Sequence, residues 1–339
     1  MVVLPSPFSD ISRVPLMYER PSDVQVLNRL TSKLGCGATF WIKRDDSNSG
    51  LAGGGNKIRK LEYVLADAIA QGADTLVTTG GIQSNHMRQT SAAAAHLGLN
   101  VALFPRDLVP FNDTEYSYAG NVQLNQILGA EVFPVDTSEE EVIQTLKSRG
   151  NQPYPIPSGA SLHPLGGLGY ARAAFEILEQ EKQLDVNFDT IVTAVGSGST
   201  LGGLVAGFKL AENRGLLSRK KRLLGFSIGH KKANMAEIVL RIARTAADKI
   251  GLKAEDITED DFEISDEFLG DAYGVLNTRT MDGIKELARA EGILTDPVYT
   301  GKAFTGLLSM AKSGKLATGN VLFLHTGGQV AMSAYPQLK

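Results

Sequence analysis

Short runs of β-branched and aliphatic residues recur along the chain, and most end in a glycine-rich or polar turn. Alanine-rich helical patterns lie between them, which is typical of parallel α/β sheets, because parallel strands need long crossover connections. We predict strands over Thr75–Thr79, Asn100–Phe104, Glu131–Val135, Thr190–Val195, Leu223–Ile228 and Val321–Leu324, and helices over Arg88–His96 and Asn121–Leu128. Ligands of such folds gather at the carboxyl ends of the strands, so we expect the chemistry at these turns.

The length of 339 residues exceeds one ordinary compact unit and predicts two domains or one large one. The segment Pro153–Pro157 is extended and stiffened by prolines, which favours a crossing between domains. Residues 237–265 combine a basic helix with the acidic stretch Glu255–Asp261, and we interpret them as a surface excursion.

Charge and composition exclude several classes of partner. The net charge of −3 gives no electrostatic case for nucleic acid, and we interpret the basic run Arg219–Arg222 as a solvated loop. No apolar stretch approaches the ~20 residues that span a bilayer, and the N-terminus lacks the basic flank of a signal peptide. The single cysteine, Cys36, excludes an intramolecular disulfide. We expect a cytoplasmic protein without a nucleic-acid or membrane partner.

Residues 51–60 place Lys57 between a glycine run and the start of a helical pattern. Burial or a neighbouring cation lowers the pKa of a lysine and makes its amine nucleophilic toward carbonyls. We expect Arg59 and Lys60 to have this effect on Lys57. An ordinary surface lysine after a tight turn is the alternative. The segment is not an ATP-binding loop, because Asn56 stands where that loop has glycine and no Gly-Lys-Ser/Thr follows.

Residues 196–200, Gly-Ser-Gly-Ser-Thr, follow a buried-looking strand and are the best phosphate-binding candidate. Backbone N–H groups and hydroxyls at a helix N-terminus bind a phosphate dianion. The dinucleotide fingerprint fails here, because Leu201 stands at its third glycine and Gly229-His230, without an acid, follows the next strand. A phosphate loop of this kind together with a nucleophilic lysine indicates pyridoxal phosphate.

The turn Gly80–His86 lies at another strand end. Ser84, Asn85 and His86 could donate to an anion such as a substrate carboxylate, or Ser84 or Asn85 could simply cap the next helix.

Two tyrosines and one histidine also lie on predicted turns. Tyr299, with Thr300 beside it, follows Asp296-Pro-Val, and Tyr273 lies in Asp271–Gly274; each could equally be a packed aromatic. We interpret His325 as a buried, hydrogen-bonded imidazole rather than a base. The five histidines have no metal-ligand spacing, so we expect no metal site.

Taken together, these motifs resemble the fold type II (tryptophan-synthase-β-like) pyridoxal-phosphate enzymes. Within them the chain is similar to the branch of 1-aminocyclopropane-1-carboxylate deaminase and D-cysteine desulfhydrase. The matching segments, in order, are 43–46, 48–52, 54–62, 81–88, 163–170, 196–200, 294–302 and 325–328.

The resemblance implies two open, twisted parallel-sheet domains flanked by helices. Residues 1–63 and 166–339 would form the large, cofactor-binding domain. Residues 64–165 would form a smaller inserted domain that closes over the substrate, and the assembly would be a homodimer.

The resemblance also implies roles for single residues. Lys57 would form the imine with pyridoxal phosphate and move the Cα proton, Asn85 would contact the phenolic oxygen, and Ser84 would receive the substrate carboxylate. Tyr299 would stack near the ring and assist proton transfer or nucleophilic attack, with Tyr273 facing the substrate. The implied cofactor-binding residues are Asn56, Lys57, Asn85, Gly196, Ser197, Gly198, Ser199, Thr200, Tyr299, Thr300 and Thr326. The implied substrate-binding residues are Ser84, Asn85, His86 and Tyr273, and the implied catalytic residues are Lys57, Ser84, Tyr273 and Tyr299.

Two positions near the pyridine nitrogen distinguish the reactions of the branch. Thr300 and Thr326 follow the desulfhydrase pattern, whereas the deaminase pattern has Glu and Leu. A carboxylate would keep the nitrogen protonated and strengthen the electron sink, which a hydroxyl pair does not. The expected reaction is β-elimination from a small D-amino acid, D-cysteine first, giving pyruvate, ammonia and hydrogen sulfide. Asn48–Ala52, His163–Gly169 and Arg241–Arg244 look more like the deaminases, so ring opening of 1-aminocyclopropane-1-carboxylate to 2-oxobutanoate is the alternative.

Two further classes remain as rivals. An amino-acid binding protein on this fold would not need Lys57, and an NAD-linked oxidoreductase would need the missing glycine and acid.

Overall fold

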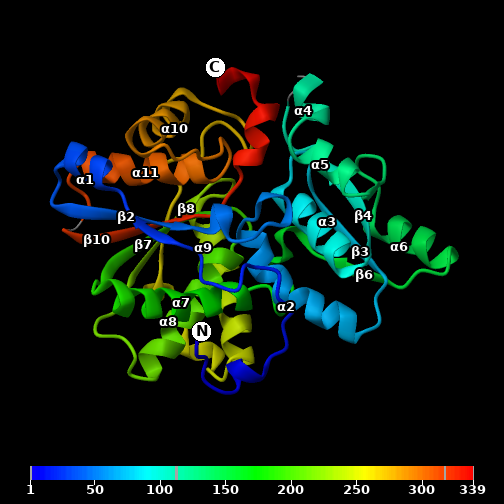
Figure 1. Cartoon of the computed structure of the whole chain (residues 1–339), viewed down its shortest axis with the longest axis horizontal. Helices are drawn as coiled ribbons and strands as arrows, with labels where there is room; N and C mark the ends of the chain where they lie inside the picture. Colours follow the sequence, from blue (N-terminus) through cyan, green and yellow to red (C-terminus); the bar gives the residue numbers. More distant parts are fainter. Residues whose placement is uncertain (1, 111–113, 317, 339) are drawn as a thin grey trace.

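Two open sheets form the framework of the protein (Figure 1). The computed structural model describes residues 2–110, 114–316 and 318–338. The larger sheet has the order β1-β2-β10-β7-β8-β9, in which only β1 is antiparallel to its neighbour. Its strands are β1 (Val24–Val26), β2 (Ala38–Arg44), β7 (Phe188–Val195), β8 (Arg222–Ser227), β9 (Glu263–Ser265) and β10 (Gly319–His325).

The smaller sheet has the order β5-β4-β3-β6 and is parallel throughout. Its strands are β3 (Thr75–Gly81), β4 (Asn100–Arg106), β5 (Glu131–Val132) and β6 (Pro153–Ile156). The predicted α/β class, with two parallel-sheet layers flanked by helices, is confirmed.

Helices cover both faces of both sheets. The α-helices are α1 (Asn28–Leu34), α2 (Asn56–Ala70), α3 (Asn85–Leu97), α4 (Thr114–Tyr118), α5 (Asn121–Ile127), α6 (Glu139–Ser148), α7 (Leu168–Leu184), α8 (Ser199–Asn213), α9 (Lys232–Lys249), α10 (Thr278–Glu291) and α11 (Thr300–Lys312). Short 3₁₀ helices are η1 (Phe8–Asp10), η2 (Asp45–Ser47), η3 (Leu51–Gly53), η4 (Ser158–Ala160), η5 (Ala254–Asp256), η6 (Glu259–Asp261), η7 (Gln329–Ala334) and η8 (Pro336–Leu338).

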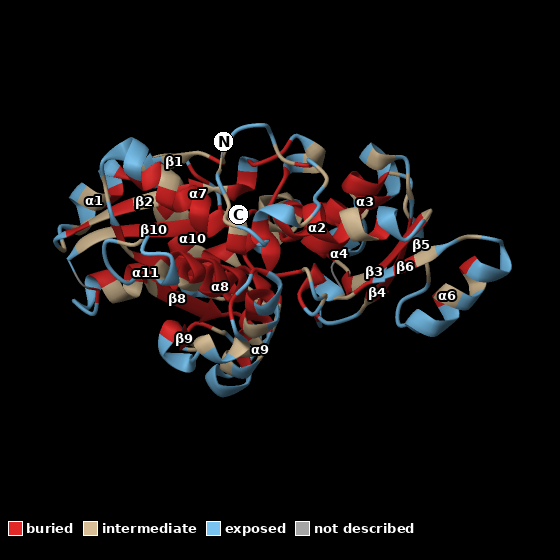
Figure 2. Ribbon diagram, turned by 90° about the horizontal axis from the view of Figure 1, so that it is seen from below, coloured by how far each residue is buried: buried red, intermediate tan, exposed pale blue. Residues whose placement is uncertain are grey.

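The strands of the larger sheet are apolar on both faces. In β10, Val321 and Phe323 pack in the core beneath α10 and α11, whereas Leu322 and Leu324 pack in the core beneath α7, α8 and α9. Successive side chains of a strand point to opposite faces, so a strand buried on both sides becomes a continuous apolar run. Figure 2 shows the resulting buried centre and the more exposed α6 at the far end of the smaller sheet.

The smaller sheet packs against α2 and α3 on one face and α6 on the other. Ile58, Leu61, Val64 and Leu65 of α2 all belong to the same core cluster as this sheet. The predicted boundary between residues 63 and 64 thus falls inside one continuous helix, with packed residues on both sides of it.

One local prediction is refined and two were wrong. The predicted extended conformation of Pro153–Pro157 is confirmed over residues 153–156, which form the edge strand β6, where the missing N–H groups of Pro153 and Pro155 are tolerated. Residues 263–265 join the larger sheet as β9, and α9 buries Val239 and Ala243 in the core, so this region is not a surface excursion. Strand β5 ends at Val132, because Pro134 interrupts the predicted run.

The basic run at residues 219–222 is only partly solvated. Lys221 is buried and its Nζ lies 2.6 Å from Glu181. Arg219, Lys220 and Arg222 each lie within 3.0 Å of an acid, namely Asp189, Asp261 and Glu263. The acidic partners leave little basic surface for nucleic acid.

Within the described residues, no helix is long and apolar enough to cross a membrane, and no cluster of three or more His, Cys, Asp or Glu side chains could hold a metal.

Candidate active site

A cavity of about 330 Å³ lies where the carboxyl ends of β3, β7, β8 and β10 face one another, between the two sheets. Its size suits a small ligand. The predicted residues in its wall are Asn56, Lys57, Ser84, Asn85, His86, Gly196, Ser197, Gly198, Thr200, Tyr273, Tyr299 and Thr326. Two predicted residues, Ser199 and Thr300, lie behind the wall.

Lys57 sits in the first turn of α2, half-buried in the cavity wall. The preceding glycines make this approach possible: Gly54 has φ +64 and ψ −158, and a Cβ there would come within 2.8 Å of Asn48 Oδ1. Lys57 Nζ donates to Asn56 Oδ1 at 3.0 Å and lies 5.9 Å from the centre of the Tyr299 ring. The Lys57 amine therefore lies next to the glycine-rich turn and points into the cavity rather than toward solvent.

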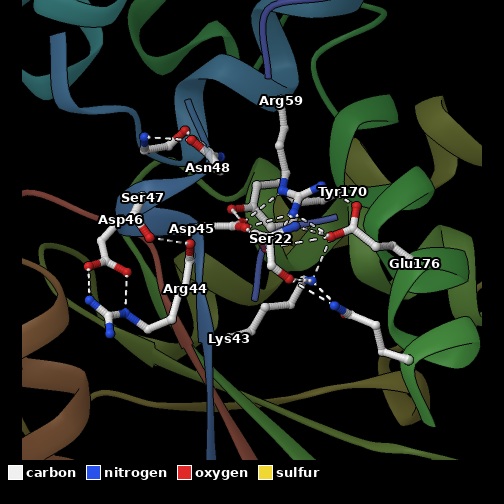
Figure 3. Close-up of polar contacts among 12 residues, drawn as sticks. Ser22, Lys43, Arg44, Asp45, Asp46, Ser47, Asn48, Arg59, Tyr170 and Glu176 are labelled. Atoms are coloured by element: carbon white, nitrogen blue, oxygen red, sulfur yellow. Dashed lines mark hydrogen bonds and ion pairs between the residues drawn. The ribbon is translucent and has the colours of Figure 1, made fainter. Parts of the chain in front are cut away.

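Burial, together with the charge of Arg88, lowers the pKa of Lys57 to about 8, while Asp296 opposes this shift. The expected contribution of Arg59 was wrong, because Arg59 points away from the cavity. Figure 3 shows its guanidinium between Asp45 and Glu176, with nitrogen–oxygen distances of 2.7 to 2.9 Å. The effective cation is Arg88 of α3, whose guanidinium donates to the carbonyls of Ala52 and Gly54 in the glycine-rich turn.

The turn 196–200 leads from β7 into α8, whose N-cap is Gly198 with φ +97 and no side-chain cap. First-turn N–H groups of a helix have no partner within the helix, so those of α8 are open to an anion. Asn56 Nδ2 donates to Thr200 Oγ1 at 3.0 Å, which leaves the Thr200 hydroxyl proton free to face the cavity. Ser199 is instead buried, with its hydroxyl 2.8 Å from Ser161 Oγ. This cradle fits a phosphate group.

The N-terminus of α3 forms the opposite wall. Ser84 caps α3, because its hydroxyl accepts from Met87 N at 3.3 Å. The predicted capping role is therefore observed, and Ser84 also lines the cavity.

His86 lies 2.9 Å from Thr78 Oγ1, whose proton goes to Ile156 O. His86 Nε2 must therefore carry the hydrogen. Burial and the charges of Lys57 and Lys60 lower the pKa of His86 well below its usual value, so the imidazole is neutral.

The hydroxyls of Tyr273 and Tyr299 contact each other, and both side chains line the cavity. Their rings lie edge to face at 6.0 Å. Burial raises the pKa of Tyr299 well above its usual value, with a further contribution from Tyr273, and burial also raises the pKa of Tyr273. The pair therefore holds its protons at neutral pH and can relay one.

Thr326 lines the cavity, whereas Thr300 is fully buried behind it. Thr300 Oγ1 donates to Asp296 Oδ1 at 2.6 Å and accepts from Asp296 N at 3.1 Å. The Asp296 carboxylate also accepts from the backbone N–H groups of residues 298, 299 and 300 at 2.7 to 2.8 Å. Its oxygens are thus already occupied by the chain.

His325 is fully buried, with Nε2 2.7 Å from Leu294 O and Nδ1 accepting from Gly327 N at 3.2 Å. The predicted structural imidazole is confirmed.

The sequence interpretation named Lys60 only as a neighbour that acts on Lys57, and it missed His230, Ser158 and Gly159. All four residues line the cavity. Lys60 is almost completely buried there, and burial together with the charge of Lys57 lowers its pKa well below the usual value. Its spacing of three residues from Lys57 places both on one helix face and could have indicated it.

Comparisons with known proteins agree with this geometry. A family model described as pyridoxal-phosphate dependent enzyme matches residues 16–327. The chain is 42% identical over 336 residues to 1-aminocyclopropane-1-carboxylate deaminase of Burkholderia ambifaria, covering 96% of this chain and 97% of that protein. A crystal structure described as the ACC deaminase homologue has a TM-score of 0.84 and 36% identity, covering 98% of this chain and 96% of that one.

Proposed function

Because the chain belongs to the fold type II pyridoxal-phosphate-dependent enzymes, in the 1-aminocyclopropane-1-carboxylate deaminase and D-cysteine desulfhydrase family, we propose that it is a β-eliminating lyase. The proposed substrate is a small D-amino acid, D-cysteine first. D-cysteine and water would give pyruvate, ammonia and hydrogen sulfide.

The cavity wall offers a partner for each functional group of the cofactor. Lys57 would supply the amine for the aldehyde, and the first turn of α8 with Ser197 and Thr200 would supply donors to the phosphate. Lys60, on the same side of α2, would add a positive charge in its protonated form. Asn85 would supply a donor for the phenolic oxygen, and Thr326 would supply a hydroxyl for the pyridine nitrogen. The bound cofactor supplies an electron sink for the pair left when the Cα–H bond breaks.

The chain's own residues would handle the protons and the substrate. With a pKa near 8, Lys57 is poised to accept the Cα proton and return it close to neutral pH. The N-terminal turn of α3 at Ser84 would bind the substrate carboxylate, because helix N-termini favour negative charge. The paired hydroxyls of Tyr273 and Tyr299 would donate a proton to the departing thiolate.

One observation supports β-elimination over ring opening: none of the described residues that line the cavity is Asp or Glu. The carboxylate of Asp296 lies behind the wall and is occupied by donors of its own chain. Without an acid facing the pyridine nitrogen, the ring would stay nearly neutral and be a moderate electron sink. A moderate sink suits loss of a good leaving group from Cβ more than opening of a ring at a carbon that bears no hydrogen.

A second candidate is deamination of 1-aminocyclopropane-1-carboxylate to 2-oxobutanoate and ammonia. It is favoured by the name of the 42% identical relative.

Product identification separates the two candidates. Purified protein is incubated with D-cysteine, L-cysteine or 1-aminocyclopropane-1-carboxylate, and keto acids are resolved by mass spectrometry. We expect pyruvate from D-cysteine alone. Chiefly 2-oxobutanoate from the cyclopropane would replace our proposal with the second candidate, and absence of any keto acid would contradict both.

The variant Thr300→Glu/Thr326→Leu tests the reason for the selectivity. It should move activity toward the cyclopropane, and unchanged selectivity would contradict the electron-sink argument.

The proposal includes closure of residues 64–165 over the substrate and assembly as a homodimer. Sedimentation of the holoenzyme at micromolar concentration tests the second part, and a monomer would contradict it.

A further inference from the structure

Asn85 is the residue of the cavity wall whose orientation matters most for its chemistry. A carboxamide has a donor end and an acceptor end, and only one of them can face a ligand. Asn85 Oδ1 accepts from Asn121 Nδ2 at 2.9 Å. Among the described residues no acceptor is found for Asn85 Nδ2, and Asn85 lines the cavity. The donor end is therefore the end presented to a ligand.

The orientation of Asn121 is fixed by the backbone. Asn121 Nδ2 donates not only to Asn85 but also to the carbonyl of Gln83 at 2.9 Å. A carbonyl oxygen can only accept, so turning the Asn121 amide around would place two oxygens against each other. Asn121 is fully buried, which makes that contact costly.

Backbone groups also fix the orientation of the Gln83 carboxamide. Its Oε1 accepts from the backbone N–H of Asn121 at 3.0 Å. Its Nε2 donates to the carbonyls of Tyr116 and Ala119 at 2.7 and 2.9 Å. Backbone groups cannot exchange donor and acceptor roles, so both amides are held in one orientation.

We infer that Gln83 and Asn121 are positioning residues that turn the Asn85 carboxamide so that it offers only N–H groups to the ligand. Neither residue lines the cavity. The inference rests on the proposed function, in which the ligand atom opposite Asn85 is the phenolic oxygen of pyridoxal phosphate. That oxygen carries negative charge, so a donor stabilises it, whereas the oxygen of a reversed amide would repel it.

Asn121→Asp tests the inference, because it keeps the shape of the side chain but removes its donors. Asn85 would then turn its NH₂ toward the new carboxylate and its oxygen toward the ligand. Asn125→Asp is the matched control. Asn125 lies one turn further along α5, accepts from Ser91 Oγ at 3.2 Å through the oxygen that Asp retains, and makes no hydrogen bond to Asn85 in the structure.

The dissociation constants of pyridoxal phosphate and of its 3-deoxy analogue, which lacks the phenolic oxygen, are measured by absorbance titration. In Asn121→Asp the affinity for pyridoxal phosphate should fall at least ~10-fold, as expected for a lost hydrogen bond to a charged oxygen, with little change for the analogue. Asn125→Asp should behave as the unchanged protein. If Asn121→Asp loses affinity for both ligands equally, or for neither of them, the inference is overturned.

Failure of the proposed function gives a different result. If the unchanged protein binds neither compound, the proposed function is wrong and this inference with it. If Asn121→Asp does not fold, Asn121→Ala removes the tether without adding a charge. It should lose part of the preference for pyridoxal phosphate over the analogue, and retention of the full preference would overturn the inference.

Discussion

The buried cations on the two sides of α2 have opposite environments: those on one side are paired with carboxylates, and those on the other side are not. On the side away from the cavity, Arg59 and Lys43 meet Asp45 and Glu176, and every charge has an oppositely charged partner within 2.9 Å (Figure 3). On the cavity side, Lys57 and Lys60 face a wall in which no described residue is acidic. Residues 57, 59 and 60 are neighbours in one helix, yet their environments differ completely.

For Arg59 and the two cavity lysines, the difference is visible in the direction of the pKa shifts. Burial would lower the pKa of Arg59, but Asp45 and Glu176 outweigh it and raise the pKa well above the usual value. Burial lowers the pKa of Lys57 and Lys60, and no carboxylate outweighs it. On the paired side the pKa of Lys43 is lowered as well, because burial outweighs the attraction of Glu176. The comparison teaches that two carboxylates keep the Arg59 guanidinium charged, whereas a buried lysine becomes titratable when burial outweighs its partners, and titratable cations are the ones a reaction can use.

The largest expected effect is on the cavity side. Lys57→Ala should abolish the visible absorbance of bound pyridoxal phosphate and lower turnover by about 10⁴-fold, because the amine proposed to transfer the proton is gone. Thermal unfolding should change little, since the half-buried side chain has no ionic partner. Spectra and keto-acid assays on the same preparation measure both. Retained turnover together with a retained visible band would mean that Lys57 is not the reacting amine.

The second effect is on the paired side. Glu176→Gln leaves Arg59 and Lys43 with one buried carboxylate between them and should destabilise the protein by about 3–5 kcal/mol. Urea unfolding measures this. Glu179→Gln on the same helix is the control, because Glu179 pairs with Lys182 at 3.6 Å on the surface and should contribute about 0–1 kcal/mol. Equal changes in the free energy of unfolding would show that the buried network contributes no more stability than the surface pair.

The pH dependence of stability follows from the same network. Burial raises the pKa of the Glu176 carboxyl, but Arg59 and Lys43 outweigh this and depress it. Its contribution is complete above the unfolded-state value of about 4.3 and is lost as the pH falls through the folded-state value. On acidification from about pH 5 to about pH 3, a range around the unfolded-state value, Glu176→Gln should therefore lose less stability than the unchanged protein.

The third effect concerns Lys60. Lys60→Met should weaken binding of pyridoxal phosphate by about 10-fold, the size of a hydrogen bond to a charged group. Because the pKa of free Lys60 is lowered, phosphate binding should take up a proton there, so affinity should fall as the pH rises. The variant should lose that slope. Lys209→Met, which removes a lysine paired with Asp261 outside the cavity, should leave both affinity and slope unchanged.

The smallest effect concerns the cation that acts on Lys57. Arg88→Met should raise the pKa of Lys57 above about 8, since a nearby positive charge is lost while the larger effect of burial remains. The rate at which cofactor-free protein captures pyridoxal phosphate, measured against pH, reports this value, because only the neutral amine reacts. Arg88→Lys keeps the charge and should leave the midpoint near that of the unchanged protein. An unshifted midpoint in Arg88→Met would mean that burial alone lowers the pKa of Lys57.

The sequence predicts those parts of the molecule that depend on local pattern. The strands over 75–79, 190–195 and 321–324, the turn at Gly196 and the placement of Lys57 at a helix start all follow from periodicity and glycine. The contribution of Arg59 was mispredicted because residues two apart on a helix point in directions roughly 160° apart, to opposite sides of the helix. Arg88 and Asn121 could not be found from spacing, since each acts from another element on a residue of the cavity wall. The short edge strands β6 and β9 carry too few residues for a periodic signal.

The proline-containing edge strand β6 has a consequence for copies of the protein at high concentration. Residues two apart in a strand direct their backbone groups to the same side, and prolines are tolerated on the side that does not bond the sheet. The outer side of β6 therefore lacks two N–H donors, at Pro153 and Pro155. The opposite edge, β5, is only two residues long. Neither edge offers a full ladder to a foreign strand, so we expect the smaller sheet to resist aggregation by strand addition.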